Sequence, residues 1–316
     1  MPVRAARPVG HGNRGESAAV KSRYFLQLIA LSALWGAGYL LTRIATPALG
    51  PSVTAAARLG FGAATLALIM YFNHAQWPWK FWRELLLLGA VGIAMPHFLY
   101  SWSSLFLPAG YSAVVSVTSV LFGAFASAWM KEDTLSFSKI FGCVAAFIGV
   151  ALVVQPGPMV SNSHVLQGTA LALCGAAMSG STAPLLKRAT TRMEPLAITA
   201  AIHLFAFALL APVALWNLPK AHFTPGAIGA VAVMGIATSG LAYWLYMRIV
   251  KHVTPVAALS STFMVTIFGV LWGHLVLDEV FTPASYAGAA LVLVATVMVT
   301  GFNPLRRSEA VVAPKP

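Results

Sequence analysis

Four ionisable side chains lie inside long apolar stretches of the chain. They are Arg58, His97, His203 and His274. A charged group at the centre of a bilayer costs about 2.5–3.5 kcal/mol on insertion scales, so each is a candidate functional residue if these stretches lie in lipid. The Arg58 guanidinium could bind a carboxylate or phosphate through two parallel hydrogen bonds. Alternatively, Arg58 could bond backbone carbonyls or extend its head group to the membrane surface.

The histidines and the acidic residues suggest different roles. A histidine can change charge near neutral pH and so could pass protons, whereas a neutral histidine bonded to a nearby hydroxyl would be structural. No Asp or Glu lies in the middle of an apolar stretch, which leaves few carboxylates for a proton or sodium relay. Glu132 and Glu279 follow the fourth and ninth stretches. Each is expected to cap the helix that follows it, because acids suit helix N-termini, or to act as a gate by pairing with a basic residue.

Aromatic and hydroxyl side chains form a second group of candidates. Rings within apolar helices can stack on an apolar substrate, although packing in the core or against lipid is an equally good interpretation of each one. Glycines and prolines, such as Gly36, Gly92 and Pro96, predict bends in the helices that line a substrate path; tight helix packing is the competing explanation. The candidates for a central binding cavity are Trp35, Tyr39, Arg58, His97, Tyr100, Ser116, Ser181, Thr182, His203, Tyr243, Thr262, Phe263 and Thr266.

These residues are carried by ten apolar stretches, each long enough to cross a bilayer as a helix. Hydrophobic residues make up 59% of the chain and charged residues 9%, whereas soluble domains carry about 25% charged residues. The composition therefore predicts an all-α polytopic membrane protein. The expected spans are 25–45, 51–72, 84–107, 109–130, 138–154, 168–190, 196–217, 226–249, 255–277 and 285–302.

The basic residues predict the orientation of these spans. The net charge of +12 comes from short clusters between spans and in the tails, a pattern of membrane orientation rather than of nucleic-acid binding. Every second connection is basic and the alternate ones are nearly bare. The positive-inside rule then predicts that both termini are cytoplasmic. The expected location is the inner (plasma) membrane of the cell. Residues 1–23 and 303–316 are expected to be disordered cytoplasmic tails.

The chain also repeats itself. Leu40–Arg43 and Leu185–Arg188 are similar and 145 positions apart, and Arg58 precedes His203 by the same offset. The repeat predicts two five-helix units, 24–155 and 165–302. Because five is odd, the second unit must be inverted relative to the first, and inverted repeats are typical of transporters that open alternately to either face. A duplicated scaffold without transport is the alternative.

Short motifs in both units resemble a known family. Ala33–Gly36, Ala57–Leu59 and the segments KEDTLSFSKIFG and LDEVFTPASYAG are similar to the paired EamA-type domains of the drug/metabolite transporter superfamily. The resemblance covers about residues 25–302. It implies a basket-like bundle around a central cavity, of the kind commonly used to export amino acids or other small metabolites. The chain departs from the pattern at Ala177–Gly180, where a Trp-bearing segment is more typical, and at His203, which replaces an Arg.

Other classes of function have weaker support. An intramembrane lipid-modifying enzyme would need a constellation of catalytic groups at one depth, and the sequence holds no HExxH, no GxSxG and no mid-span carboxylate pair. Cys143 and Cys174 lack metal-ligand spacing and are interpreted as packing residues. The expected partners are a small-molecule substrate and the lipid bilayer, with no cofactor and no metal. The oligomeric state stays open.

Overall fold

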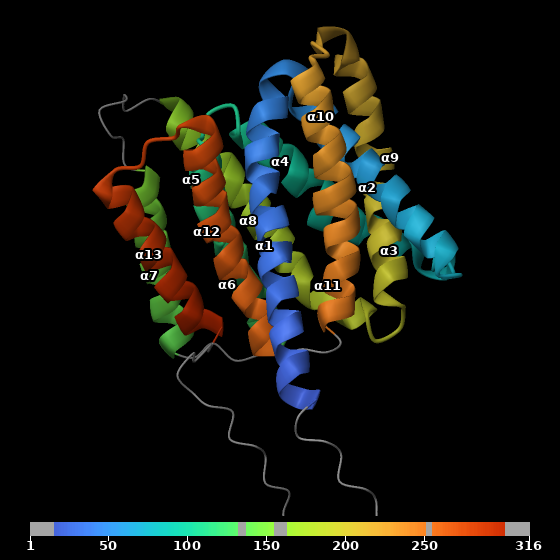
Figure 1. Cartoon of the computed structure of the whole chain (residues 1–316), viewed down its shortest axis with the longest axis horizontal. Coiled ribbons are helices and arrows are strands. Elements are labelled where there is room, and N and C mark those ends of the chain that lie inside the picture. The colour runs from blue at the N-terminus through green and yellow to red at the C-terminus, as the bar shows by residue number, and fades with distance from the viewer. Residues whose placement is uncertain (1–15, 132–136, 155–162, 251–254, 301–316) are drawn as a thin grey trace, which may run out of the picture.

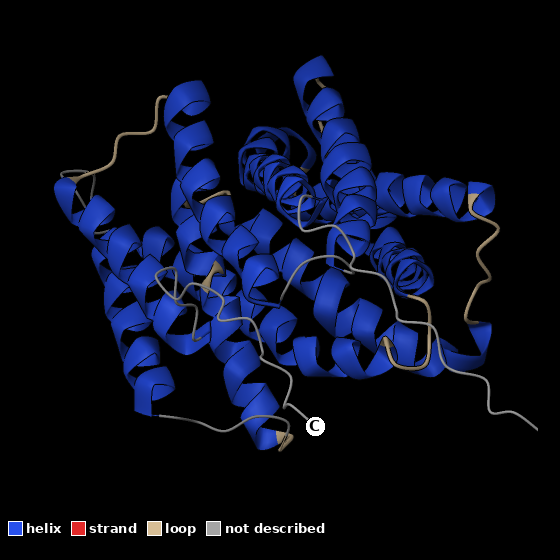
Figure 2. Ribbon diagram, turned by 60° about the horizontal axis from the view of Figure 1, so that its bottom comes forward, coloured by secondary structure: helices blue, strands red, loops and turns tan. Residues whose placement is uncertain are grey.

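A computed structural model describes residues 16–131, 137–154, 163–250 and 255–300. These residues form helices and short connections, with no strand among them (Figure 2). The helices are α1 (Glu16–Leu49), α2 (Pro51–Phe72), η1 (Trp79–Phe81), α3 (Trp82–Leu88), η2 (Gly89–Ala94), α4 (Met95–Ser103), α5 (Ala109–Ser116), α6 (Thr118–Trp129), α7 (Phe137–Val154), α8 (Ser163–Ala189), α9 (Pro195–Asn217), η3 (Leu218–Lys220), α10 (Pro225–Val233), η4 (Met234–Leu241), α11 (Ala242–Val250), α12 (Pro255–Leu277) and α13 (Pro283–Thr300).

Seven helical segments are long and apolar enough to cross a membrane, as judged over the described residues. They run from Leu26–Leu49 through Pro225–Tyr246. Three shorter apolar helices, Ile140–Val150, Met264–Leu277 and Pro283–Ala295, lie where the other three spans are expected. The sequence prediction of an all-helical membrane protein is therefore confirmed. One detail was wrong, because α1 is already helical from Glu16, within the expected N-terminal tail.

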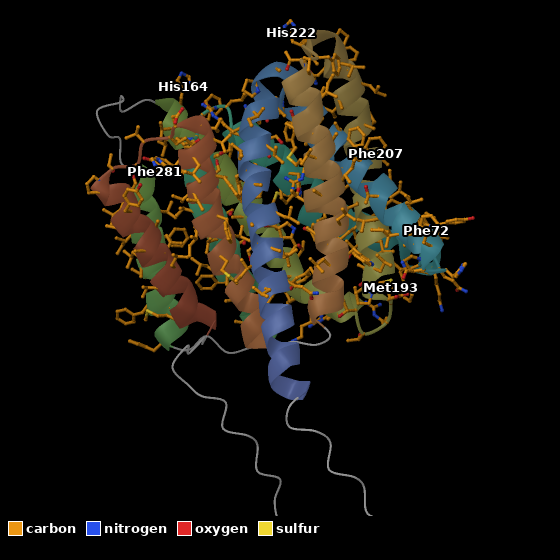
Figure 3. All side chains as sticks on the ribbon, viewed as in Figure 1. Phe72, His164, Met193, Phe207, His222 and Phe281 are labelled. Carbon is orange, nitrogen blue, oxygen red and sulfur yellow. The ribbon has the colours of Figure 1, made fainter. Side chains whose placement is uncertain are left out.

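Neighbouring helices in the second half of the chain run in opposite directions. Figure 3 places His164, His222 and Phe281 at one end of the bundle and Met193 at the other. His164 lies at the start of α8, Met193 between α8 and α9, and His222 between α9 and α10, so the chain reverses direction between α8 and α9. Large apolar side chains such as Leu68 and Trp216 are 56% and 82% exposed. Such a surface suits lipid rather than water.

Four helix pairs make the most extensive contacts, and each joins the first half of the chain to the second. α1 packs on α12, α2 on α9, α6 on α8, and α7 on α13; α7 and α13 lie side by side at one edge of the bundle (Figure 1). The largest buried cluster draws on α1, α2, α9 and α10, with Leu59, Ile198 and Met234 fully buried. Helices of both halves therefore meet in the largest cluster.

Glycines allow two of these pairs to approach closely. A Cβ on Gly36 in α1 would lie 2.8 Å from the Phe268 Cβ and 2.9 Å from the Gly269 nitrogen of α12. A Cβ on Gly180 in α8 would lie 2.1 Å from the Ser119 carbonyl oxygen of α6. Because α1 and α8 continue as helices through these positions, the glycines serve tight packing rather than helix interruption. A bend of α1 near Gly36 stays a prediction, because close packing and a bend are compatible.

The third and eighth expected spans contain π-helical segments instead. η2 begins at Gly89 and η4 begins at Met234, 145 positions later. A π segment inserts an extra residue into an α-helix, and such segments occur frequently at functional sites. The sequence prediction of an irregular third span near Gly92 is confirmed, and η4 was not foreseen.

Candidate functional site

A cavity of about 300 Å³ lies between the helices of the two halves. That volume is at the lower end of the range for small-molecule sites. Seven of the thirteen cavity candidates predicted from the sequence line it, so the structure brings just over half of these distant residues together. The lining residues are Trp35, Gly38, Tyr39, Thr42, Arg58, Gly92, Pro96, His97, Tyr100, Ser104, Ser112, Ser116, Val117, Ser119, Ser179, Tyr243 and Val265.

Arg58 extends from α2 and is held by two neutral hydroxyls of η4. Its Nε donates to Ser239 Oγ at 2.9 Å, and one terminal nitrogen donates to Thr238 Oγ1 at 3.3 Å. Thr238 itself donates to the Met234 carbonyl at 2.6 Å. The guanidinium carries five N–H groups, and it has no carboxylate partner in the described part of the chain. Donors therefore stay available to a ligand in the cavity.

Aromatic rings form one wall of the cavity. Trp35 Nε1 donates to the Thr238 carbonyl at 3.1 Å, and its ring centroid lies 5.5 Å from that of Tyr243. Tyr39 donates to Ser116 Oγ at 2.5 Å, and its ring lies edge-on to Tyr100 at 6.3 Å. These hydrogen bonds fix the ring positions, which leaves preformed surfaces for an apolar part of a ligand.

Serines on α5 and α6 line another side. Ser112, Ser116 and Ser119 follow the i, i+4, i+7 spacing of one helical face. Of these three serines only Ser116 was predicted from the sequence, although the spacing could have identified Ser112 and Ser119. The Ser112 hydroxyl is buried and has no hydrogen-bond partner within the described structure.

His97 presents its ring to the cavity from α4. Its Nδ1 lies 2.7 Å from the Ile93 carbonyl oxygen, one turn earlier in the same helix. The expected hydroxyl partner is therefore replaced by a backbone carbonyl. His203 makes the same type of bond, with Nδ1 2.8 Å from the Thr199 oxygen.

Several candidates do not line the cavity. His203 is fully buried behind the wall, with its ring 5.0 Å from that of Tyr243 and its Nε2 without a described partner. Ser181 is exposed on the outside of α8. Thr182 is buried and would contact a Cβ on Gly92, and Thr266 is buried in α12. The side chains of Thr262 and Phe263 lie outside the described part.

Glu279, an acid at a helix end, does not line the cavity. Glu279 accepts hydrogen bonds from the backbone nitrogens of Ala109 and Gly110, at 2.5 and 3.0 Å. It therefore caps α5 rather than the helix that follows it, because the loop after α12 folds back onto the start of α5. Thr282 caps α13 instead, accepting from Ser285 N at 3.1 Å. Glu132 lies outside the described residues.

Comparisons with known proteins agree with this architecture. The model of the EamA-like transporter family matches residues 23–155 and again 166–301. A solved structure described as a crystal structure of a protein superposes with a TM-score of 0.64 at 19% identity, covering 88% of this chain and 98% of that one. At this identity the likeness concerns the fold alone.

Curated relatives align over most of their length. The uncharacterized inner membrane transporter YedA of Escherichia coli K12 is 26% identical over 305 residues, which cover 92% of this chain and 94% of that protein. An uncharacterized transporter of Archaeoglobus fulgidus is 22% identical over 263 residues, covering 82% of this chain and 92% of that protein. Since the family model matches most of the sequence in two copies, the chain belongs to the EamA-like transporter family and is a multi-pass membrane transporter.

Proposed function

We propose that this transporter exports small metabolites that carry a carboxylate, such as amino acids. It crosses the inner membrane ten times with both termini in the cytoplasm, and two inverted five-helix halves open the central cavity alternately to either side. The observation that carries the proposal is Arg58, which lines the cavity without a carboxylate partner among the described residues.

The packing pattern supports two equivalent halves. α1 and α12 belong to the first and ninth expected spans, and α8 and α6 belong to the sixth and fourth. When the first five spans are exchanged with the last five, the α1–α12 pair therefore becomes the α8–α6 pair. The same exchange leaves the α2–α9 and α7–α13 pairs unchanged. The close glycine crossings at Gly36 and Gly180 fall in the exchanged pairs. Such equivalence is what alternating access between two similar conformations requires.

The chemistry of the cavity supports a carboxylate. A guanidinium offers a planar fork of donors that matches a carboxylate, and a low local dielectric strengthens the pairing. The hydroxyls of Ser239 and Thr238 orient that fork without neutralising it. The rings of Trp35 and Tyr243 offer an apolar surface in the same cavity. A substrate with a carboxylate and an apolar or aromatic group fits this arrangement.

Counterflow in proteoliposomes tests the proposal. Vesicles containing the full-length protein and an excess of unlabelled amino acids should accumulate labelled amino acids faster than empty vesicles. Arg58→Ala should lower this uptake at least about tenfold, because a lost charged hydrogen bond costs about 1.5–3 kcal/mol. Arg83→Ala, which removes an arginine outside the cavity lining, should leave uptake unchanged.

The abundance and melting temperature of both variants decide the interpretation. If Arg58→Ala lowers them, the arginine serves the fold rather than the substrate. Absence of counterflow for wild-type protein across a panel of amino and organic acids would contradict the proposed substrate class.

A further inference from the structure

The imidazole of His97 has one nitrogen bonded to its own helix and the other open to the cavity. A carbonyl oxygen only accepts hydrogen bonds, so the 2.7 Å contact with the Ile93 oxygen requires the hydrogen on Nδ1. In a neutral ring, Nε2 is then an acceptor. The described part of the chain gives Nε2 no hydrogen bond, and His97 lines the cavity. This acceptor is therefore accessible to a ligand.

The surroundings of His97 favour the neutral ring. Arg58 already contributes a positive charge to the same cavity, and no Asp or Glu is among the described residues that line it. A second positive charge without a compensating anion is electrostatically unfavourable. The other polar groups of the wall are hydroxyls and ring edges, so His97 Nε2 differs from them in being able only to accept.

Arg58 and His97 are complementary in hydrogen bonding. The guanidinium can only donate, and neutral Nε2 can only accept. They lie on α2 and α4, which contact each other, and line one cavity of about 300 Å³. A molecule with an anionic acceptor at one point and a donor close by satisfies both groups.

We propose that His97 is a specificity-determining residue, whose Nε2 accepts a hydrogen bond from an amino or hydroxyl group of a substrate bound through its carboxylate to Arg58. This inference rests on the proposed function. It assigns the preference for amino and hydroxy acids over simple carboxylic acids to one atom. A substrate without the donor would leave Nε2 desolvated and unpaired, which a polar site rejects.

His203 provides a matched control within the same chain. It makes an equivalent bond to its own helix, and its Nε2 also has no described partner. Unlike His97, it is fully buried and does not line the cavity. A substitution at His203 therefore removes an imidazole near the site without removing a group that can reach the substrate.

Binding of three related carboxylates to the purified full-length protein tests the inference. 3-Phenylpropionate has a carboxylate and a ring, 3-phenyllactate adds a hydroxyl beside the carboxylate, and phenylalanine adds an ammonium there. Wild-type protein should bind the last two roughly tenfold more tightly than the first, the size expected for one hydrogen bond. His97→Phe should abolish this preference, while His97→Gln, which keeps an acceptor, and His203→Phe should retain it.

The preference is a ratio, so a general loss of folded protein does not change it. Equal binding of all three ligands to wild-type protein, or a preference that survives in His97→Phe, would overturn the assignment of His97 and leave the role of Arg58 intact. Binding of none of the three would contradict the proposed function itself. If His97→Phe does not fold, His97→Ala takes its place with the same expectation.

Discussion

Arg58 is poised by contacts that leave its charge available. Ser239 and Thr238 accept from two of its donors, and neither carries a charge. Gly38 leaves space beside it, since a Cβ there would lie 3.7 Å from one terminal nitrogen. The guanidinium is therefore oriented before a ligand arrives, which lowers the entropy cost of binding.

The Thr238 hydroxyl should affect substrate affinity more than stability. Thr238→Val removes the acceptor of one Arg58 hydrogen bond and the bond to Met234. We expect affinity for a carboxylate ligand to fall about two- to tenfold, from the loss of one hydrogen bond that orients Arg58. Thr46→Val is the matched control, because Thr46 is also buried and donates to its own helix, to the Thr42 carbonyl.

Ligand titration and thermal melting of the two variants separate these effects. A similar loss of melting temperature in both, with weaker binding in Thr238→Val alone, is the expected result. Equal affinities in the two variants would show that Thr238 does not position Arg58.

The site residues differ in how far the sequence could reveal them. Arg58 was identifiable because a charge in an apolar stretch is costly. His203 was selected as its counterpart in the repeat, but an equivalent position does not determine which side of a helix faces a cavity. Thr238 and Ser239 reach Arg58 from a π-helical segment. Such a segment shifts which residues face the cavity, and the regular α-helical spacing used on the sequence does not predict that shift. The pairing of Glu279 with α5 depends on a contact across 170 positions that no local signal reports.

At the scale of elements, two close helix crossings depend on the absence of side chains. Gly36 meets α12, and Gly180 meets the backbone of α6 at Ser119 and Gly123. Apolar surface gains little from burial in lipid, so membrane helices associate through close packing of this kind. The length and apolar character of these helices follow from the sequence, whereas the choice between a hinge and a packing role for their glycines required the structure.

An added methyl group should therefore loosen these crossings. Gly36→Ala and Gly180→Ala are each expected to destabilise the protein by about 1–3 kcal/mol, the usual cost of overpacking. Gly229→Ala should be neutral or slightly stabilising, because nothing lies within 4 Å of its Cβ position and alanine favours a helix.

Melting temperatures in one detergent, measured for all three variants, test this prediction. No loss of stability in Gly180→Ala, where the clash is with backbone, would mean that the α6–α8 crossing is looser than the structure indicates.

At the scale of the whole molecule, the charge pattern of the sequence and the positions of the connections in the structure agree on how the chain runs back and forth. Basic and nearly bare connections alternate along the sequence. In the structure, Met193, which lies in a basic connection, and His222, which lies in a nearly bare one, are at opposite ends of the bundle (Figure 3). An ion pair of 2.6 Å joins Arg192, in the connection between α8 and α9 near Met193, to Glu84 in the first turn of α3. Aromatic residues gather nearby, where Trp77 and Trp79 stack at 5.2 Å, as in an interfacial belt.

Labelling of single cysteines in intact cells tests which end faces outward. With Cys143 and Cys174 replaced by serine, a membrane-impermeant maleimide should label His222→Cys. It should reach Thr191→Cys only after the membrane is permeabilised. Both positions are exposed, and Thr191 precedes Met193 by two residues, at the end of the bundle opposite to His222. The reverse pattern would invert the proposed orientation, and with it the side from which Arg58 is reached.

The two π segments also carry information about ancestry. Leu40 and Leu185, Arg58 and His203, and the starts of η2 and η4 are all separated by 145 positions. All three pairs lie at or before the π segments, so the two segments begin at equivalent positions of the repeat. The similar segments that follow, KEDTLSFSKIFG from Lys131 and LDEVFTPASYAG from Leu277, are 146 positions apart. The two copies therefore differ by one residue in length after the π segments begin, and Arg58 and its counterpart His203 have diverged to different side chains.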